Sequence, residues 1–388
     1  MPPRPTKAIP SAVRPTSPEI MESVRKIGDC FAIAGEFVLG EEISSGLINA
    51  TYRATYQRED GSQDRYVLQR INEKVFTDPH AVMRNIETVT RHINWKVLRV
   101  KKDASGQTIN LYPARGGKCY AEGPGGGVWR CYNYIEACRT YDVVENTRQA
   151  YQAAFAFGAF QDLVSDLTAD DLKETLPNFH HTPQRIANLE KSIAADPKGR
   201  VAQVAEEIQF IRDRAHWTSK VIDGLADGSI PLRVTHNDTK INNVMIDAKT
   251  DQAVCVIDLD TVMPGSTLYD FGDLVRTATS PAPEDETNLD LVTMQMPMFE
   301  GLVEGYLDAA GGFLEPAEID LLAFSGKLIA LEIGVRFLTD FIDGDNYFKT
   351  TRENHNLDRC RTQLKLVESI EAQEGQMEKF VRRIARNL

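Results

Sequence analysis

The first third of the chain contains short runs of apolar and β-branched residues that are separated by polar turns. Runs of this length, bounded by Gly, Asn and Ser, predict β-strands. The strand candidates are Phe37–Leu39, Ala50–Gln57, Tyr66–Ile71, Asn110–Tyr112 and Val128–Ile135. A different pattern follows Asp78, where Val82, Ile86, Val89 and Ile93 recur every three or four residues and predict a helix.

Beyond about residue 138 the apolar positions follow a helical period almost everywhere. Helices are predicted over 150–167, over 191–225 with a break at Pro197, over 318–342 and over 358–385, with one strand-rich stretch at 231–263. The pattern predicts an α+β fold of two lobes. A small, sheet-rich lobe over residues 30–136 precedes a larger, mainly helical lobe over residues 137–388.

Residues 1–29 are predicted to form a disordered or extended tail. The first 18 residues contain six prolines and no acidic residue, and they lack the apolar run of a signal peptide. The most apolar later stretch, Leu321–Leu338, is interrupted by Lys327, Glu332 and Arg336. It therefore predicts a core helix, and no membrane span is expected.

Composition narrows the classes of partner. The 388 residues carry a formal net charge of -12 and a pI near 5.2, so no basic face for nucleic acid is expected. The acidic balance would tolerate a neutral or cationic small substrate. The six cysteines form no C-x-x-C pair and have no histidine cluster beside them, which argues against disulfides and zinc and favours a cytoplasmic protein.

The candidate chemistry lies in the segment V-T-H-N-D-T-K-I-N-N-V-M-I-D, which begins at residue 234. His236, Asp238 and Asn243 fit H-x-D-x-x-x-x-N, and the apolar strand that follows ends in Asp258. Phosphoryl transfer needs a carboxylate beside the attacking hydroxyl and oxygen ligands for the magnesium ion that bridges the phosphates. The spacing therefore predicts a phosphotransferase; the alternative is a hairpin whose polar residues only cap turns.

This segment resembles the aminoglycoside phosphotransferase and choline kinase superfamily, relatives of the protein kinases. The resemblance spans nearly the whole chain after the tail and implies a bilobal, protein-kinase-like fold that uses ATP and Mg²⁺. It implies that Asp238 is the catalytic base, that Asn243 and Asp258 are magnesium ligands, and that His236 braces the loop. Lys240 stands where many protein kinases carry a lysine that meets the γ-phosphate; the alternative is a solvated loop charge.

A second motif, Asp270-Phe271-Gly272, spells the D-F-G metal motif of the protein kinases. It lies 27 residues beyond Asn243, which is too far for that role, and Asp258 fits the role better. We expect Asp270 to begin a helix and to tie the catalytic loop from behind. Asp260 is either a further metal ligand or a turn residue.

On the phosphate side, the resemblance implies two nucleotide contacts that depart from the kinase pattern. The loop Ser44–Ile48, with Ser45 and Gly46, lies where kinases cover the phosphates, but it has one glycine and is not G-x-G-x-x-G. Arg70 replaces the lysine of V-A-I-K and can still pair with phosphate. Glu87 is a candidate ion-pair partner for it, or else a solvated helix charge.

On the adenine side, Tyr134 and Glu136 lie at the end of the last small-lobe strand, where hinge backbone groups meet the base. The alternative is a buried strand end. The glycine-rich turn Gly123–Gly127 has the composition of a phosphate loop, but a strand follows it rather than a helix. We therefore expect a hairpin connection there.

Longer runs narrow the resemblance to the N-acetylhexosamine 1-kinase group. They are V-I-D-L-D-T-V-M-P-G beside the loop motif, L-P-N-F-H-H-T-P-Q-R from Leu176, and R-F-L-T-D-F-I-D-G-D-N-Y-F from Arg336. The resemblance implies transfer of a phosphoryl group onto the anomeric hydroxyl of GlcNAc or GalNAc. Arg336, Tyr347 and His180, with His181, are the candidate sugar-binding residues; the alternatives are an ion pair, a packing aromatic and a plain loop histidine.

A small acceptor is favoured over a protein because the segment between Asp258 and Asp270 is short and no A-P-E motif follows it. Two other functions stay open. The first is a kinase for an aminoglycoside, choline or a related alcohol, which the acidic balance would suit. The second is a nucleotide-binding pseudokinase module. The single glycine of the loop Ser44–Ile48 and the arginine at position 70 favour this alternative.

Overall fold

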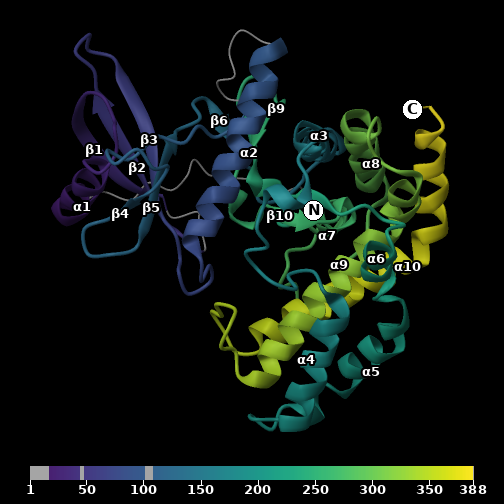
Figure 1. The fold of residues 1–388 in the computed structure, drawn as a ribbon. Coiled ribbons are helices and arrows are strands. Elements are labelled where there is room, and N and C mark those ends of the chain that lie inside the picture. The colour runs from purple at the N-terminus through teal and green to yellow at the C-terminus, as the bar shows by residue number, and fades with distance from the viewer. Residues whose placement is uncertain (1–16, 44–47, 101–107, 388) are drawn as a thin grey trace, which may run out of the picture. The chain divides into compact units, whose positions relative to one another are not determined.

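The computed structural model describes residues 17–43, 48–100 and 108–387 (Figure 1). The chain forms two compact units. The first contains the described residues of 1–141 together with 170–176 and 244–263, and the second contains 142–169, 177–243 and the described residues of 264–388. The predicted α+β class is confirmed, with a sheet-rich N-terminal part and a mostly helical C-terminal part.

A five-stranded antiparallel sheet is the framework of the first unit, with the order β1-β2-β3-β5-β4. Its strands are β1 (Glu36–Ile43), β2 (Ala50–Gln57), β3 (Gln63–Arg70), β4 (Ala121–Glu122) and β5 (Val128–Asn133). Strand β3 lies centrally, so Arg70 faces Ala50 on one side and Trp129 on the other. The strand predicted over 110–112 is reduced to an isolated bridge between Leu111 and Tyr132.

Helix α1 (Pro18–Gly28) packs against this sheet, so the predicted tail is wrong for these residues. Ser17 caps the helix by accepting a 3.2 Å hydrogen bond from the Ile20 N–H, and proline is well tolerated at the first helical position. Val24 and Ile27 then bury themselves in the sheet core. The prolines of residues 1–16 lie outside the described residues.

Helix α2 (Pro79–Val100) confirms the helix predicted after Asp78. The Asp78 carboxylate accepts a 2.9 Å hydrogen bond from the Ala81 N–H at the helix start. The predicted apolar stripe, Val82, Ile86, Val89 and Ile93, is buried throughout.

A three-stranded sheet in the order β6-β8-β9 explains why the first unit takes in residues 244–263. Strand β6 (Cys138–Arg139) pairs with β8 (Val244–Asp247), which pairs with β9 (Ala253–Val256). Cys138 lies opposite Asp247. A single boundary near residue 137 misses this exchange, because the pairing joins segments more than a hundred residues apart.

Eight helices make up most of the second unit as the structure describes it. They are α3 (Thr147–Val164), α4 (Thr182–Ala195), α5 (Ala205–Arg214), α6 (Lys220–Asp227), α7 (Thr267–Ala278), α8 (Met296–Ala310), α9 (Pro316–Asp343) and α10 (His355–Ala385). Strand β7 (Arg233–Thr235) pairs with β10 (Met263–Gly265). Short 3-10 turns of this unit occupy 201–203, 215–217, 241–243 and 289–291; the turn at 259–261 belongs to the first unit, and the turn at 169–171 lies at the boundary between the units along the chain.

The helical stretch predicted over 191–225, with a break at Pro197, contains the end of α4 and the helices α5 and α6, so the predicted break is confirmed. Helix α4 ends at Ala195, and the next residue, Asp196, adopts the left-handed conformation with φ 35°. Pro197 follows and disfavours a helical conformation in the residue before it, so the chain turns before α5 begins. The other predicted helices correspond to α3, α9 and α10.

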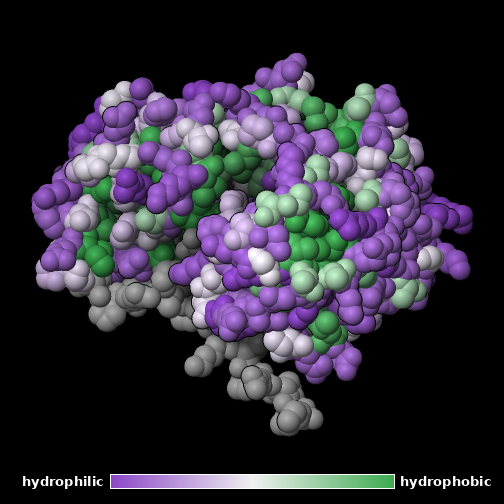
Figure 2. All heavy atoms as spheres, turned by 90° about the horizontal axis from the view of Figure 1, so that it is seen from below, coloured by the Kyte–Doolittle hydropathy of each residue, from purple (hydrophilic) through white to green (hydrophobic). Residues whose placement is uncertain are grey.

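Helix α9 is the core helix of the second unit and packs against α4, α7 and α10. Two charged residues within its apolar stretch are buried and paired: Lys327 with Glu374 at 2.5 Å and Glu332 with His180 at 2.9 Å. None of the helices that the structure describes is long and apolar enough to cross a membrane. On the face seen in Figure 2, hydrophilic residues cover most of the surface, and the apolar residues gather in smaller patches.

Glycines allow α3 and α8 to cross closely (Figure 1). A Cβ at Gly301 would lie 2.8 Å from the Thr147 carbonyl oxygen, and one at Gly305 would fall on the Tyr151 carbonyl. A Cβ at Gly158, on the facing helix, would lie 2.8 Å from the Tyr306 carbonyl oxygen. Because these obstacles are backbone atoms, the helices must separate to admit a side chain.

We therefore predict that Gly305→Ala lowers the free energy of unfolding by about 1–3 kcal/mol, the usual cost of overpacking. Gly375→Ala is the matched control, since Gly375 lies in α10 and a methyl group added there would meet no atom within 4 Å. It should stabilise the protein by up to about 1 kcal/mol through helix propensity. Urea denaturation of both variants measures the free energy of unfolding. If both substitutions change it by the same amount in the same direction, the close crossing of α3 and α8 is contradicted.

Candidate active site

The loop between β7 and the 3-10 turn at 241–243 is held by the carboxylate of Asp270, in the first turn of α7. One oxygen of Asp270 accepts a 2.7 Å hydrogen bond from the Asn237 N–H. The other accepts bonds from the His236 N–H at 3.0 Å and from the Gln161 amide at 2.5 Å. The prediction that Asp270 ties the loop from behind is confirmed, and both of its oxygens are occupied.

The glycine of this D-F-G sequence serves helix packing. A Cβ at Gly272 would lie 2.5 Å from the Ser325 carbonyl oxygen, so α7 and α9 touch through backbone at this point. Asp270 therefore anchors the loop, and Gly272 allows the close packing of α7 and α9. The motif shares its sequence with the metal motif of protein kinases but has a structural role here.

Asp238, Lys240 and Asn243 lie together on the loop. The Lys240 ammonium is 2.8 Å from the Asp238 carboxylate, and the Asn243 side-chain amide donates to the Asp238 carbonyl oxygen at 2.8 Å and to its carboxylate at 3.4 Å. Asp238 keeps a quarter of its side chain exposed. These contacts place a partly open carboxylate beside a cation and an amide.

Electrostatics keep Asp238 ionised. Burial raises the pKa of its carboxyl, but the Lys240 ammonium outweighs burial, with help from His236 and Arg276, so the pKa lies below its usual value. The same attraction raises the pKa of Lys240. The pair is therefore a carboxylate and an ammonium at neutral pH.

His236 lies in the interior behind the loop. Its ring packs edge-on against Phe157 at 5.3 Å and Phe160 at 5.9 Å, and its Nδ1 accepts a 3.3 Å hydrogen bond from the Asp238 N–H. These contacts are those of a structural brace, as the motif predicts.

Asp258 belongs to the first unit and follows β9, where Val256 pairs with Val244. It adopts the left-handed conformation with φ 60°. Asp260 is buried, and its oxygens accept hydrogen bonds from the Arg130 guanidinium and, at 2.5 Å, from the Asn49 amide. Because both oxygens are engaged, the structure favours a bracing role for Asp260 over a further metal ligand.

Arg130, which motif analysis missed, is the most buried cation of the first unit among the described residues. It lies on β5 with 1% of its surface exposed, ion-paired with Asp260 and bonded through Nε to Gln69 on β3 at 2.9 Å. Gln69 in turn donates to Thr51 at 2.9 Å. The available signal was an arginine in the middle of the apolar run V-W-R-C-Y, which requires a buried partner.

Arg70 lies at the exposed end of β3, with its guanidinium against Gly127. The proposed Arg70–Glu87 pair differs from what the structure describes: Glu87 contacts the Cys119 thiol at 3.2 Å and Arg91 at 3.9 Å. Gly127 lies in the turn between β4 and β5, so the hairpin connection predicted there is confirmed.

Tyr134 and Glu136 follow β5. The Tyr134 N–H donates to the Arg65 carbonyl oxygen at 3.0 Å, and the half-exposed Glu136 carboxylate pairs with the Arg65 side chain at 2.7 Å. Ser45 and Gly46, the predicted phosphate-loop residues, lie outside the described residues.

Arg336 on α9 lies among three aromatic rings of the second unit. The centres of the Phe179, Phe348 and Tyr347 rings are 5.6, 5.5 and 5.9 Å from its guanidinium carbon. Tyr347 is 68% exposed, so its ring is available to a ligand. Burial and the neighbouring Arg336 lower the pKa of Arg185, so two guanidinium groups share this region.

The histidines predicted to line a sugar pocket have other partners. His180 is buried, and its ring nitrogens lie 2.9 Å from the Glu332 carboxylate and 3.1 Å from the Asn237 carbonyl oxygen. His181 caps α4 by accepting a 3.1 Å hydrogen bond from the Gln184 N–H. Neither ring nitrogen of His180 is left for a sugar, which corrects that assignment.

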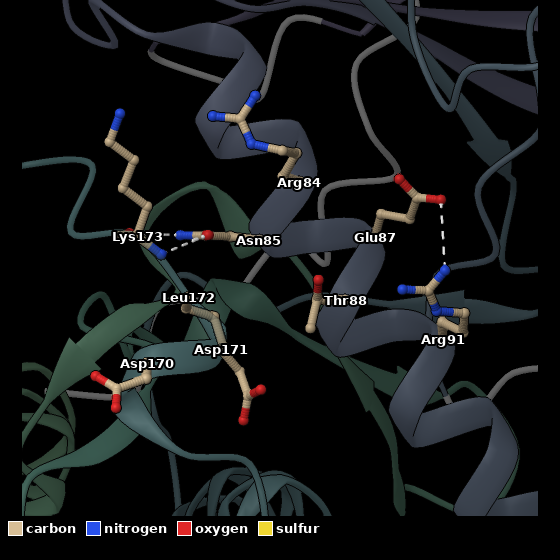
Figure 3. A pocket seen from close by; sticks show the side chains of 9 residues that line it. All are labelled: Arg84, Asn85, Glu87, Thr88, Arg91, Asp170, Asp171, Leu172 and Lys173. Atoms are coloured by element: carbon tan, nitrogen blue, oxygen red, sulfur yellow. Dashed lines mark hydrogen bonds and ion pairs between the residues drawn. The ribbon is translucent and has the colours of Figure 1, made fainter.

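A groove of about 460 Å³ lies between α2 and residues 170–173, and Glu87 is one of its lining residues (Figure 3). Its wall is tied together by Asn85, whose amide donates to the Lys173 and Val262 carbonyl oxygens at 2.7 and 3.0 Å. Arg84 and Arg91 face solvent at its rim. We assign the groove a structural role, because its buried amide is fully bonded within the protein.

Residues 40–320 match the family model of the phosphotransferase enzyme family. An aminoglycoside phosphotransferase from Alicyclobacillus acidocaldarius is similar in structure, with 11% identity, a TM-score of 0.60, and 95% of this chain and 98% of that chain covered. An amicoumacin kinase is 15% identical, with a TM-score of 0.56 over 91% of this chain and 93% of that chain. A microcompartment-associated aminopropanol kinase is 16% identical, with a TM-score of 0.56 over 92% and 98%. At these identities the likeness shows a shared fold.

We predict that Arg130→Met lowers the free energy of unfolding by about 3–5 kcal/mol, because it leaves the Asp260 carboxylate buried without its cation. The double variant Arg130→Met/Asp260→Leu should recover most of that loss. Arg139→Met is the control: its ion pair with Asp251 is about one-third exposed, and its loss should cost less than about 1 kcal/mol. Urea denaturation measures the free energy of unfolding of each variant. Equal decreases in Arg130→Met and Arg139→Met would argue against a buried charge at Arg130.

Proposed function

The chain belongs to the phosphotransferase enzyme family and is a small-molecule phosphotransferase, and we propose that it transfers the γ-phosphoryl group of ATP to the anomeric hydroxyl of an N-acetylhexosamine. The observation that carries the proposal is the grouping of Asp238, Lys240 and Asn243 on one anchored loop. A carboxylate, a cation and an amide oxygen are the groups that such a transfer uses. The products would be ADP and the sugar 1-phosphate.

Asp238 orients the acceptor hydroxyl and removes its proton in this proposal. The proton passes to the carboxylate as the sugar oxygen bonds to the γ-phosphorus, and the bond from that phosphorus to the β,γ-bridging oxygen breaks. The lowered pKa of Asp238 keeps it ready to orient the hydroxyl, and proton transfer follows late, when the oxygen has become acidic. The Lys240 ammonium offsets negative charge on the transferring group.

Asn243 and Asp258 suit a magnesium ion by their chemistry. The Asn243 amide nitrogen is bonded to Asp238, which leaves the amide oxygen to act as a ligand. One amide oxygen and one carboxylate, completed by phosphate oxygens and water, form the donor set that Mg²⁺ prefers. Such an ion would neutralise charge on the phosphates. The similar amicoumacin kinase structure carries AMP-PNP and Ca²⁺, which supports the use of a nucleotide with a divalent cation.

For the nucleotide, we propose Arg70 as a phosphate contact, together with Ser45 and Gly46. The Arg70 guanidinium is exposed, as such a contact requires. Tyr134 and Glu136 would meet the adenine through backbone groups at the end of the strand. Of these, the Tyr134 N–H is already bonded to Arg65, so its carbonyl oxygen is the relevant group.

The region around Arg336 favours a neutral sugar over a cationic acceptor. Arg336 and Arg185 both carry positive charge, while the nearby Glu332 carboxylate is already paired with His180. A guanidinium beside exposed aromatic rings can donate to a sugar hydroxyl or acetamido oxygen while the ring covers an apolar sugar face. An aminoglycoside or choline would meet repulsion here, so we favour the sugar despite the acidic net charge.

We predict that ATP and Mg²⁺ support ADP release with GlcNAc or GalNAc and that Asp238→Asn lowers kcat at least about 100-fold by removing the proton acceptor. The 1-O-methyl glycosides should be inert because they lack the anomeric hydroxyl. A coupled ADP assay with free sugars, choline and an aminoglycoside as the panel measures this. Turnover only with choline or the aminoglycoside would overturn the sugar assignment and leave the phosphotransferase intact.

Arg336→Gln should raise the KM for GlcNAc about 10-fold or more, the effect of losing a charged hydrogen bond, and leave the KM for ATP unchanged. It should also narrow the preference for GlcNAc over glucosamine, which is a cation at neutral pH. Arg382→Gln, in an exposed pair with Glu378 on α10, is the control and should change neither value. If Arg336→Gln keeps the wild-type preference for GlcNAc over glucosamine, Arg336 is not part of the acceptor site.

A further inference from the structure

His180 bridges helix α9 and the loop that carries Asp238. Its Nδ1 lies 2.9 Å from a carboxylate oxygen of Glu332, and its Nε2 lies 3.1 Å from the carbonyl oxygen of Asn237. A carbonyl oxygen accepts hydrogen bonds and cannot donate, and an ionised carboxylate does the same. Both contacts are therefore complete only when each ring nitrogen carries a proton, as in an imidazolium.

The surroundings fix the ring in this orientation. Phe179 packs edge-on at 4.7 Å, and the Tyr269 ring stacks at 4.8 Å. The second carboxylate oxygen of Glu332 accepts a 2.7 Å hydrogen bond from the Thr182 hydroxyl. His180 and Glu332 are both buried, so neither charge is satisfied by solvent.

The charges around the ring support the ionised pair. Burial lowers the pKa of His180, but Glu332, the Asn237 carbonyl and Asp273 on α7 together raise it above its usual value of 6.5. Burial raises the pKa of Glu332, but His180, Thr182 and Arg336 on α9 bring it below its usual value. Arg185 on α4, Tyr269 on α7 and His236 are also titratable groups of this region, and burial and Glu332 raise the pKa of Tyr269.

The accepting carbonyl belongs to the peptide unit that joins Asn237 to Asp238. That peptide is held at both ends, since its oxygen meets His180 and its N–H donates to His236 at 3.3 Å. Asn237 itself adopts a left-handed conformation with φ 65°, which a free chain populates sparingly. The direction in which the Asp238 side chain leaves the loop depends on this peptide plane.

We propose that His180, as an imidazolium paired with Glu332, is a positioning residue that locks the Asn237–Asp238 peptide and makes phosphoryl transfer dependent on its proton. The kinetic consequence rests on the proposed function, whereas the protonation state does not. The folded pKa is raised, so the lock is present at low and neutral pH and is lost as the pH rises through that value. Loss of either ring proton removes one of the two hydrogen bonds.

The first measurement is the nitrogen-15 spectrum of selectively labelled histidine, with the His180 signals assigned by their loss in His180→Gln. We expect both ring nitrogens of His180 to be protonated at neutral pH. In Glu332→Gln the ring should carry one proton at the same pH, because burial is no longer opposed by a carboxylate. A singly protonated His180 ring in the wild-type protein at neutral pH would overturn the proposal.

The second measurement is the pH profile of kcat with the best acceptor of the panel. We expect kcat to fall at alkaline pH and the fall to move to lower pH by about one to two pH units in Glu332→Gln, with the KM for ATP unchanged. Glu190→Gln on α4, which removes an exposed partner of Arg212 on α5, should leave the profile in place. If kcat falls at the same alkaline pH in Glu332→Gln and in Glu190→Gln, the proposed link between the His180 proton and catalysis is refuted.

The third measurement keeps the two proposals separable if no acceptor is turned over. Amide hydrogen exchange at Asp238, compared between variants at one pH, should be faster in His180→Leu than in Glu190→Gln, because the Asn237 carbonyl oxygen loses the donor on Nε2. Equal exchange would refute the lock whether or not the protein is a sugar kinase. A doubly protonated ring with changed exchange but no turnover would refute only the proposed substrate.

Discussion

The carboxylate of Asp270 is the constraint on which the candidate active site depends. The loop after β7 is not part of a strand, and Asp270 accepts the N–H groups of both His236 and Asn237. Its own carbonyl oxygen accepts the Thr239 hydroxyl at 2.5 Å. Because α7 is pressed against α9 at Gly272, this anchor is part of the helical core, and the position of Asp238 is set by the packing of the whole unit.

Buried charges in both units serve the same purpose, which is to hold a functional segment in one orientation. Removing a charge from water is costly, so each of them needs a fixed partner. Arg130 and Asp260 join the sheet to the segment that follows Asp258, and His180 with Glu332 joins α9 to the peptide before Asp238. The chemistry proposed for the chain therefore rests on ion pairs that no ligand would touch.

Features that depend on neighbours along the chain were predictable. The stripe of α2, the core helix α9 and the spacing of Asp238 and Asn243 are local patterns, and the structure contains the two helices where the pattern places them. Helix α1 was missed because six prolines outweighed a cap at Ser17 and an apolar face that needs the sheet beneath it. The contact between Glu87 and Cys119 was missed because a side-chain contact across 32 residues leaves no period in a sequence.

The sequence by itself determined the family, the class of fold and the residues proposed for the chemistry, because phosphoryl transfer requires certain side chains at short, fixed spacings. Only the tertiary structure decided what supports them. Arg130 and Asp260 are 130 residues apart, and His180 and Glu332 are 152 apart. A histidine on a loop and an arginine on a strand have many compatible partners in a sequence, and it is burial, which forces every charge and backbone group to find one, that selects among them.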